Sequence, residues 1–438
     1  MNFEHVKSIT LTILIITSAV LTWNIWTTQP EYEDIDPNGF IPVKTEEKEI
    51  NDILKLKGIL FHSGGSHFQM TDSVEMDKFQ ANLSKWTLNG YKDVSSEKAG
   101  SAEEFSDFLH SEANTEILLT DEVPFKTFSM LLNSDEKDLP RFSFDRIVFQ
   151  AKESNQRDSS IYFVSTKSKE VIESKLNGAD MEGFYQTYYK KAQTLPEYES
   201  YKVSKERTLF ILKEKPKLEK LIYSIKYVNL SNLKKALFDN PSEVRTEKVE
   251  DGEEFSDDGS LMTVRSNSLI SYVDTTEKGN NINSFASSEI IQQSINHVNN
   301  HAGWEDNKYQ FAGLNENNQS IFFQLFIEGI PVFNELGMSQ IEQVWGNANI
   351  YRYKRPAFAL DFPLQSDGAE VELPTGREAI KALEMKEGFQ LSKLQDLVVG
   401  YHLSKPSSDD KFVTLEPAWY YRSGDTWAIV SFAEPGGE

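Results

Sequence analysis

The sequence predicts an α+β fold in which a single N-terminal transmembrane helix carries a multi-domain ectodomain of mixed helices and strands. Three observations lead to this prediction. A long uncharged apolar run begins near the N-terminus, and short apolar strand patterns then alternate irregularly with amphipathic helical patterns. The chain of 438 residues also exceeds the size of one ordinary core, which indicates two to four domains.

The composition narrows the classes of function. The chain has 45 basic and 68 acidic residues, a net charge of −23, which disfavours nucleic-acid binding because that depends on cationic side chains at the phosphates. It contains no cysteine, so thiol nucleophiles, disulfides and thiolate metal sites are excluded. A cysteine-free extracytoplasmic domain must be held together by its hydrophobic cores, which is ordinary in a bacterium.

The first element is the membrane helix, which we place at residues 8–28. The run contains no charge, and about 20 helical residues cross a hydrocarbon core of about 30 Å. Trp23 and Trp26 stand at its far end, where indole rings favour the membrane interface and where a signal peptide would need a small-residue cleavage site. Lys7 precedes the run and acidic residues follow it, so residues 1–7 are expected in the cytoplasm and the ectodomain outside the cell membrane.

One face of this helix carries mainly small and hydroxylated residues. They are Ser8, Thr12, Ile15, Ala19 and Thr22. Such residues permit close approach and hydrogen bonds between membrane helices. This face is predicted to dock on another membrane protein, and the alternative is a plain anchor that merely tolerates threonine.

The remaining chain divides into four parts by composition and pattern. They are a juxtamembrane stalk at 29–55, an N-terminal α+β domain at 56–193, a β-rich middle domain at 194–283 and a C-terminal α+β domain at 284–438. Prolines and acidic residues mark the stalk. The later boundaries follow changes in the balance of helical and strand patterns.

In the N-terminal domain, apolar residues at helical spacing predict a helix from about Ser73 to Leu88. Ser101 and Glu104 form a capping box ahead of a second helix, and Pro124 opens a third. Strands are predicted at Leu56 to His62 and Glu116 to Thr120, and a hairpin is predicted from Arg146 to Ala151 and Ile161 to Ser165.

Strand patterns dominate the middle domain, and a short helix near Ser231 to Phe238 interrupts them. The strands are Thr208 to Lys213, Leu221 to Val228, Leu261 to Arg265 and Leu269 to Val273. The acidic run from Glu247 to Asp258 is predicted to be an exposed loop.

The C-terminal domain is predicted to contain two helix-plus-antiparallel-sheet repeats. One begins with a helix at about Ser287 to Asn300 and the other with a helix at about Thr375 to Met385. Each helix is followed by two strands, which are Tyr309 to Leu314 and Ile321 to Ile327 in the first unit, and Leu397 to Leu403 and Lys411 to Leu415 in the second.

Two histidine motifs are the nearest approach to a reactive site. His297 and His301 are four residues apart on a predicted helix, but the glutamate of a zinc-protease motif is absent. A helix end with partly buried histidines is therefore favoured over a metal site. The segment from His62 to His67 contains two glycines and two serines, and we interpret it as a flexible loop, because it lacks the lysine of a phosphate loop and the spacing of a hydrolase elbow.

The aromatic residues of the last domain admit two interpretations. Trp304, Trp345, Trp419, Tyr420, Tyr421 and Trp427 are of the type that stacks on sugar rings, but such residues more often fill sheet cores. We predict no catalytic residue, no cofactor and no metal ligand, and hence no enzymatic activity.

At several places the sequence resembles the YycH (WalH) family. The resemblance is carried by Leu21-Thr-Trp-Asn-Ile-Trp26 with Gln29-Pro30 and Tyr32, by Ser294-Ile-Asn-His-Val-Asn-Asn-His-Ala-Gly-Trp304, by Gly329-Ile-Pro-Val-Phe333, by Tyr353-Lys-Arg-Pro356 and by Glu416-Pro-Ala-Trp-Tyr420. It extends over the whole chain and is least distinctive between residues 190 and 280.

The resemblance implies an accessory regulator of the YycG/YycF (WalK/WalR) two-component system, which governs cell-wall metabolism. It implies that the protein acts beside a second single-pass protein, YycI (WalI), and contacts the sensor histidine kinase YycG (WalK), partly through membrane helices. It further implies a C-terminal part similar in fold to YycI. An extracytoplasmic receptor for a ligand or peptide is the first alternative, and a cell-wall hydrolase is the second.

Overall fold

The computed structural model describes residues 14, 17–18, 47–132, 138–151, 159–277, 285–301, 303–304, 308–364 and 368–432. The described residues from 47 onward belong to one compact unit, and residues 1–41 are assigned to another. The predicted membrane-helix residues Ser8, Thr12, Ile15, Ala19, Thr22, Trp23 and Trp26 lie outside the described residues. Within the part of the chain that is described, no helix has the length and apolar character needed to span a membrane.

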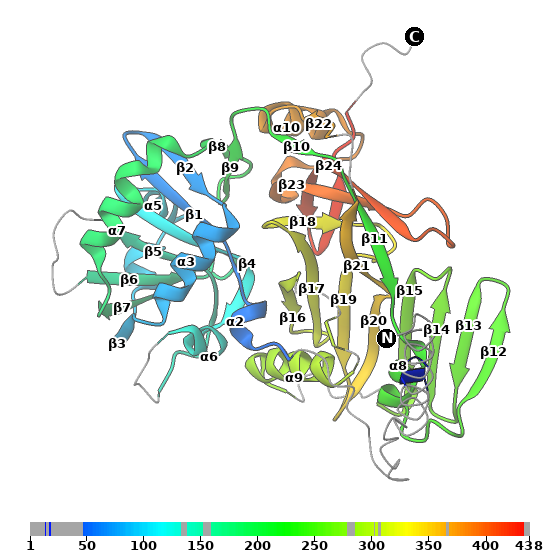
Figure 1. Ribbon diagram of the computed structural model, residues 1–438. Helices are drawn as coiled ribbons and strands as arrows, with labels where there is room; N and C mark the ends of the chain where they lie inside the picture. Colours follow the sequence, from blue (N-terminus) through cyan, green and yellow to red (C-terminus); the bar gives the residue numbers. More distant parts are fainter. Residues whose placement is uncertain are drawn as a thin grey trace, which may run out of the picture. The chain divides into compact units, whose positions relative to one another are not determined.

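The first large sheet is formed by the N-terminal half of the chain (Figure 1). Its strands are β1 (Leu56–Ser63), β2 (Ser66–Met70), β3 (Thr87–Asp93), β4 (Asn114–Pro124), β5 (Ser143–Gln150), β6 (Ser159–Val164), β7 (Val171–Asn177), β8 (Glu197–Lys202) and β9 (Thr208–Leu212). They lie in the order β3-β7-β6-β5-β4-β1-β2-β8-β9, and the described pairs are antiparallel.

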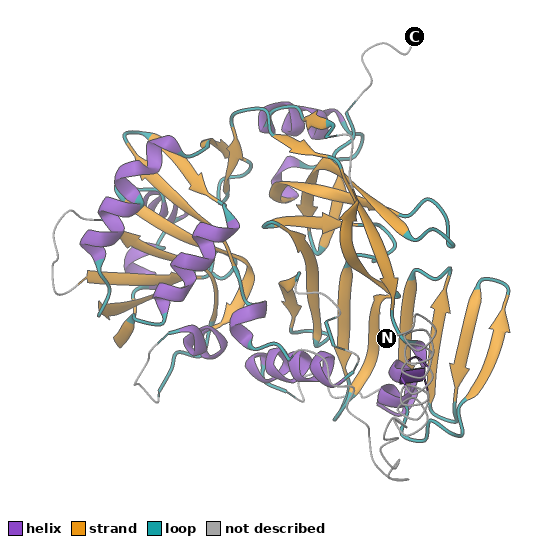
Figure 2. Cartoon of the chain, in the orientation of Figure 1, coloured by secondary structure: helices purple, strands orange, loops and turns teal. Residues whose placement is uncertain are grey.

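Short helices cover both faces of this sheet. They are α2 (Ile50–Ile53), α3 (Ser73–Leu83), α4 (Ser95–Lys98), α5 (Ala102–Leu109), α6 (Phe125–Phe128) and α7 (Met181–Thr187), with 3₁₀ turns at Ser129–Leu131 and Tyr189–Thr194. Ile147 and Phe149 of β5 face the core beneath α3 and α7, whereas Val148 between them faces Phe105 and Leu109 of α5. Figure 2 shows α3 and α7 together on one face, as the alternation of strand side chains requires.

Most predicted elements of this half are confirmed. Asp72 caps α3, which ends at Leu83 and is thus shorter than the predicted helix, although Trp86 beyond it is still buried. Ser101 caps α5 by accepting a hydrogen bond from the Glu104 amide, and Pro124 stands at the N-cap of α6. The predicted hairpin is formed by β5 and β6.

The second large sheet is built from the C-terminal half. Its strands are β11 (Leu221–Tyr227), β12 (Arg245–Val249), β13 (Gly252–Ser256), β14 (Ser260–Arg265), β15 (Leu269–Asp274), β16 (Tyr309–Asn315), β17 (Ser320–Ile327), β18 (Ile330–Phe333), β19 (Gln340–Trp345), β20 (Ile350–Pro356), β21 (Phe358–Leu364), β23 (Leu394–Ser404), β24 (Phe412–Ser423) and β25 (Thr426–Ile429). The order is β12-β13-β14-β15-β20-β19-β17-β18-β23-β24-β11-β21, with β16 on β17 and β25 on β24. The β18–β23 pair is parallel, and the other described pairs are antiparallel.

The remaining elements of this half are three helices, two 3₁₀ turns and a small pair of strands within the described residues. They are α8 (Leu230–Leu237), α9 (Ser287–Asn300), α10 (Gly376–Met385), the turns Thr275–Glu277 and Leu391–Lys393, and β10 (Lys217–Glu219) with β22 (Glu370–Glu372). The predicted helices and strands of the C-terminal domain are confirmed, and α9 and α10 are each followed in the chain by an antiparallel hairpin.

The strands of the range 194–283 join both large sheets. β8 and β9 extend the first sheet beyond β2, whereas β11 pairs with β24 and β15 pairs with β20 of the second. Residues 47–55, which we assign to the stalk, also pack against the folded unit. Ile50 and Ile53 are buried, and the Lys48 amide donates to Asn299 Oδ1 over 3.0 Å.

The acidic run from Glu247 to Asp258 is not the exposed loop that we predicted. It forms the β12–β13 hairpin, in which Val249 faces Gly252 across a two-residue turn. Phe255 is buried beside Met262 of β14. This apolar contact packs β13 onto the sheet, although the acidic residues around Phe255 are typical of a loop. A Cβ at Gly252 would lie 1.8 Å from the Val264 carbonyl oxygen, so glycine is required there.

The β8–β9 hairpin connects the two sheets. Only its base pairs with β2, at His67 with Tyr198 and at Phe68 with Glu197. Further along, Leu209 and Ile211 of β9 enter a core formed with α10, β23 and β24. Arg377 Nε of α10 donates to Glu199 Oε1 of β8 over 2.9 Å, which adds a polar tie to this apolar contact.

Candidate functional site

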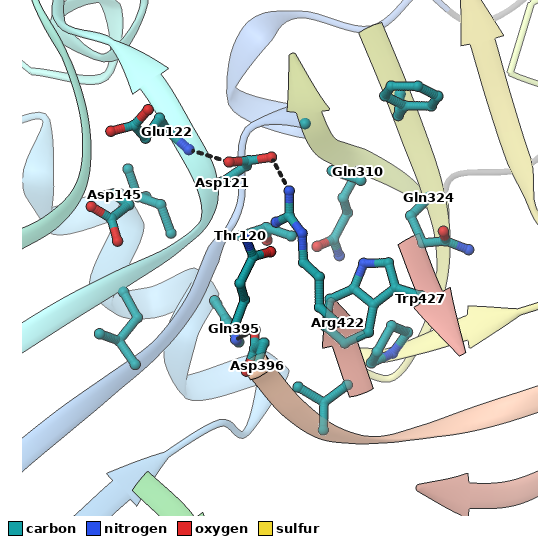
Figure 3. Close-up of a pocket in the computed structure, with 18 of the residues that line it drawn as sticks. Thr120, Asp121, Glu122, Asp145, Gln310, Gln324, Gln395, Asp396, Arg422 and Trp427 are labelled. Atoms are coloured by element: carbon teal, nitrogen blue, oxygen red, sulfur yellow. Dashed lines mark hydrogen bonds and ion pairs between the residues drawn. The ribbon is translucent and has the colours of Figure 1, made fainter. Parts of the chain in front are cut away.

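A large cleft of about 2770 Å³ lies between the two sheets and is the first candidate for a functional site. Its walls come from β4 and β5 on one side and from β16, β17 and β23–β25 on the other. Figure 3 shows Asp121 of the first sheet directed toward Arg422 of the second, where Gln310, Gln324, Gln395 and Trp427 also line the cleft. The cleft is therefore polar on both sides, with an aromatic surface at Trp427.

A bulge in β4 shapes the middle of the cleft. The register of β4 against β5 shifts between Leu118 and Val123, so the residues between them leave the regular ladder. Asp121 in this bulge receives a hydrogen bond and ion pair from Arg422 of β24 at 3.0 Å (Figure 3). Gly313 of β16 allows this approach, because a Cβ there would lie 2.6 Å from Asp121 Oδ2.

Three further carboxylates of the cleft, Glu122, Asp145 and Asp396, also have protein partners. Glu122 accepts a hydrogen bond from Ser165, and burial raises the pKa of the Glu122 carboxyl. Asp145 accepts from the amide and the hydroxyl of Thr166, each at 2.7 Å. Lys57 forms an ion pair with Asp396. Within the described residues, no group of histidines and carboxylates has the arrangement of a metal site.

The aromatic residues of the last domain mostly fill cores, as the sequence favours. Trp304, Trp419, Tyr420 and Tyr421 are buried, and the Trp419 indole donates to the Pro374 carbonyl over 2.7 Å. Trp427 lines the cleft, and it packs on Phe333, which in turn stacks on Tyr420 at 4.2 Å between ring centroids.

Beside the cleft, the first sheet contains a cluster of ionisable residues around the fully buried Glu116. Glu116 Oε2 lies 2.5 Å from Arg146 Nη1, and Glu116 Oε1 lies 2.7 Å from His62 Nε2. His62 Nδ1 in turn lies 2.7 Å from His67 Nδ1. His110 completes the cluster at 3.8 Å from Glu116, and we call these five residues the histidine cluster.

The histidine cluster contains one anion, the Glu116 carboxylate, and one permanent cation, the Arg146 guanidinium. Burial would raise the pKa of the Glu116 carboxyl, but Arg146 and the hydrogen bond from His62 hold it well below its usual range. Burial lowers the pKa of His110 to about 4. Burial also lowers the pKa of His67, and the neighbouring His62 acts in the same direction. At neutral pH the charges of Glu116 and Arg146 therefore cancel, and His67 and His110 are neutral.

The segment from His62 to His67, predicted to be a flexible loop, is not a loop, and the histidine cluster was therefore not predicted. The structure forms a hairpin there: Gly64 and Gly65 have φ angles of 63° and 74° and make a two-residue turn. His62 and His67 become cross-strand partners in consequence. The Gly-Gly pair was the available signal, since positive φ at both positions is the requirement of a type I′ turn.

The His297 and His301 pair is confirmed as a partly buried pair at a helix end. The two rings stack at 3.7 Å between centroids, and His301 Nδ1 lies 2.6 Å from the His297 carbonyl oxygen. Burial lowers the pKa of His301 to about 4, and burial followed by His301 lowers that of His297. Gly303, with φ of 65°, donates to the Val298 carbonyl and closes the helix.

Family models match nearly the whole chain. The model described as "YycH protein, N-terminal domain" matches residues 4–193, and "YycH protein, C-terminal domain" matches residues 206–437. A curated relative from Bacillus subtilis (strain 168), named "Two-component system WalR/WalK regulatory protein YycH", is 26% identical over 439 residues, which cover 96% of this chain and 94% of that protein.

A solved structure shares the fold. The crystal structure of YycH from Bacillus subtilis superposes with a TM-score of 0.74 over 89% of this chain and 99% of that chain, at 19% sequence identity. The mixed α+β architecture with antiparallel sheets is thus that of a known fold, and the expected fold class is confirmed at that level.

Proposed function

The chain belongs to the YycH protein family, and from this premise we propose that it is a membrane-anchored extracytoplasmic regulator of a WalR/WalK-type two-component system. The observation that carries the proposal is the family match over both halves of the chain, at residues 4–193 and 206–437. The name of the Bacillus subtilis relative, a regulatory protein of the WalR/WalK system, supports the same role.

The mechanism in this proposal is one of packing between proteins. The ectodomain pairs outside the membrane with a second single-pass protein of the YycI (WalI) type. The helix at 8–28 crosses the membrane once and presents Ser8, Thr12, Ile15, Ala19 and Thr22 to helices of the kinase WalK (YycG). Docking that differs between two kinase conformations shifts their populations, and such coupling is typically worth about 1–3 kcal/mol.

The proposal assigns no catalytic role to the ectodomain. Four carboxylates of the cleft, Asp121, Glu122, Asp145 and Asp396, each have a hydrogen-bond or ion-pair partner in the protein. This arrangement is typical of residues that hold two walls together.

The cleft favours a second, compatible role as a receptor for an extracytoplasmic ligand or peptide. Its volume of about 2770 Å³ and its mixture of amides, paired charges and Trp427 suit an extended polar ligand better than a small apolar one. In this role a ligand bound in the cleft would change the position of one sheet relative to the other, and this conformational change would alter the contacts with the kinase.

Substitution of the small membrane face tests the docking directly. We expect Ala19→Leu combined with Thr22→Leu to reduce co-purification of the kinase from solubilised membranes, because bulk on this face prevents close helix approach. Thr10→Leu combined with Thr17→Leu is the matched control, since at about 3.6 residues per turn these positions lie on the opposite face. Undiminished recovery of the kinase with the first pair would contradict docking by this face.

A further inference from the structure

A chain of hydrogen bonds runs from the buried Glu116 to the partly exposed His67. Ionised Glu116 can only accept, so His62 Nε2 donates to it over 2.7 Å. In the arrangement with one proton on each ring, the other nitrogen of His62 accepts, and His67 Nδ1 donates to His62 Nδ1, also over 2.7 Å. The remaining nitrogen of His67, Nε2, is thus unprotonated in the neutral chain. A proton added there leaves both hydrogen bonds in place.

Charged groups surround this chain on each element packed against it. Arg146 of β5 neutralises Glu116, and Asp145 lies 3.7 Å from Arg146. His110 at the end of α5 stands 3.8 Å from Glu116. The carboxylates that act on His67 besides Glu116 are Glu112, which accepts from the Gly64 amide, and Glu197 of β8, which is paired with Lys213 at 2.9 Å. Tyr198 of β8 is cross-strand to His67, and burial raises the pKa of its phenol to about 12.

Phe210 of β9 covers the cluster from the side of the cleft. Its ring centroid lies 5.4 Å from that of His62, 4.8 Å from His67 and 4.9 Å from His110. Its neighbours Leu209 and Ile211 point to the opposite side of β9 and enter the core of α10, β23 and β24. One strand thus contacts the histidines with one face and the second sheet with the other.

We propose that His67 is a proton-binding site, and that proton uptake there releases the β8–β9 hairpin from the histidine cluster and so alters the connection between the two sheets. An imidazolium needs hydration that the ring of Phe210 excludes. A state in which β9 has moved away restores that hydration and binds the proton more tightly. A ligand shifts an equilibrium toward the state that binds it more tightly. Proton binding therefore favours the state in which β9 has moved away from the histidine cluster.

Burial is the largest influence on the pKa of His67 and lowers it from its ordinary value of 6.5. Between that lowered pKa and 6.5, each pH unit shifts the equilibrium toward the released state by up to about tenfold for one proton. Proton binding at His67 involves the ectodomain alone and requires neither the kinase nor any other regulatory partner.

Spin-label distances in the full chain, held in lipid nanodiscs, test the release. The chain has no cysteine, so Lys175→Cys on β7 and Lys205→Cys in the β8–β9 turn provide the two labelling sites, and both positions are exposed. We expect one distance population at pH 7.5 and a second, growing population as the pH falls to 5.5. His67→Asn should abolish the second population, because the amide can still donate to His62 but does not titrate.

His402→Asn is the matched control, since it removes a partly exposed histidine of β23 whose Nδ1 bonds Tyr420 over 2.9 Å. It should respond to pH as the native chain does. A pH response that persists in His67→Asn, or the absence of a response in the native chain, would overturn the proposal.

A second measurement remains decisive if His67→Asn fails to fold. The pKa of His67, followed by its imidazole NMR resonance, should rise toward 6.5 in Phe210→Leu, because the smaller side chain admits water. An unchanged pKa in that variant would show that Phe210 does not control proton uptake, and the proposal would fail.

Discussion

Replacing Glu116 by leucine is expected to lower the free energy of unfolding by about 3–5 kcal/mol. Glu116 has no exposed surface and balances the guanidinium of Arg146, whose side chain is only 20% exposed. Leucine would leave this mostly buried cation with only the longer approach to Asp145, at 3.7 Å. It would also remove the acceptor of the His62 ring. The cost arises from the unpaired charge rather than from the value of the ion pair itself.

Urea denaturation followed by circular dichroism measures this loss. Adding Arg146→Met to Glu116→Leu should recover most of it, because removing both charges of a buried pair is often nearly neutral. Glu372→Leu is the matched control, since its pairs with Lys215 and Lys217 lie on the surface and contribute little. A Glu116→Leu variant as stable as Glu372→Leu would contradict the view that Glu116 is needed to neutralise the charge of Arg146.

Acid should destabilise the folded unit well above the range in which carboxylates titrate. Burial lowers the pKa of His110 and of His301 to about 4, so the folded state binds fewer protons than the unfolded chain below pH 6.5. Their contribution to stability is therefore fully present above pH 6.5 and is lost as the pH falls toward 4. Each group removes about 1.4 kcal/mol per pH unit in this window.

The buried histidines dominate the slope of unfolding free energy between pH 6.5 and 4.5, and the raised pKa of Glu122 opposes them near the lower end. Glu116 also destabilises the folded state in acid. Because its pKa is lowered from 4.5, its contribution to stability is lost only below pH 4.5. His110→Asn should flatten the slope by about 1.4 kcal/mol per pH unit. A native protein whose stability is constant from pH 6.5 to 4.5 would contradict the inferred burial of neutral histidines.

Local patterns in the sequence predicted many of the helices and strands. Apolar periodicity placed α9 at Ser287–Asn300, which are its observed bounds, and a serine cap located the start of α5. These signals succeed because a cap or an apolar stripe is decided by residues a few positions apart.

The assembly of the sheets and the histidine cluster depended on contacts that local patterns do not contain. Glu116 is 54 residues from His62 in the chain and 30 from Arg146, and their meeting requires the register of β1, β4 and β5. The β12–β13 hairpin was hidden by its charge, since a single buried Phe255 outweighs an acidic surface. The strands of residues 194–283 divide between two sheets, since β8 extends the first sheet at β2, whereas β11 and β15 pair with β24 and β20 of the second.

Co-purification of the native chain and of a version whose residues 8–28 are replaced by an unrelated membrane helix tests the regulatory role most directly. With the native chain we expect the WalK-type kinase and a second single-pass protein, and with the replaced helix we expect the kinase to be lost. Recovery of the kinase with both chains would contradict docking through the membrane helix. Recovery of no kinase with the native chain would contradict the regulatory role itself.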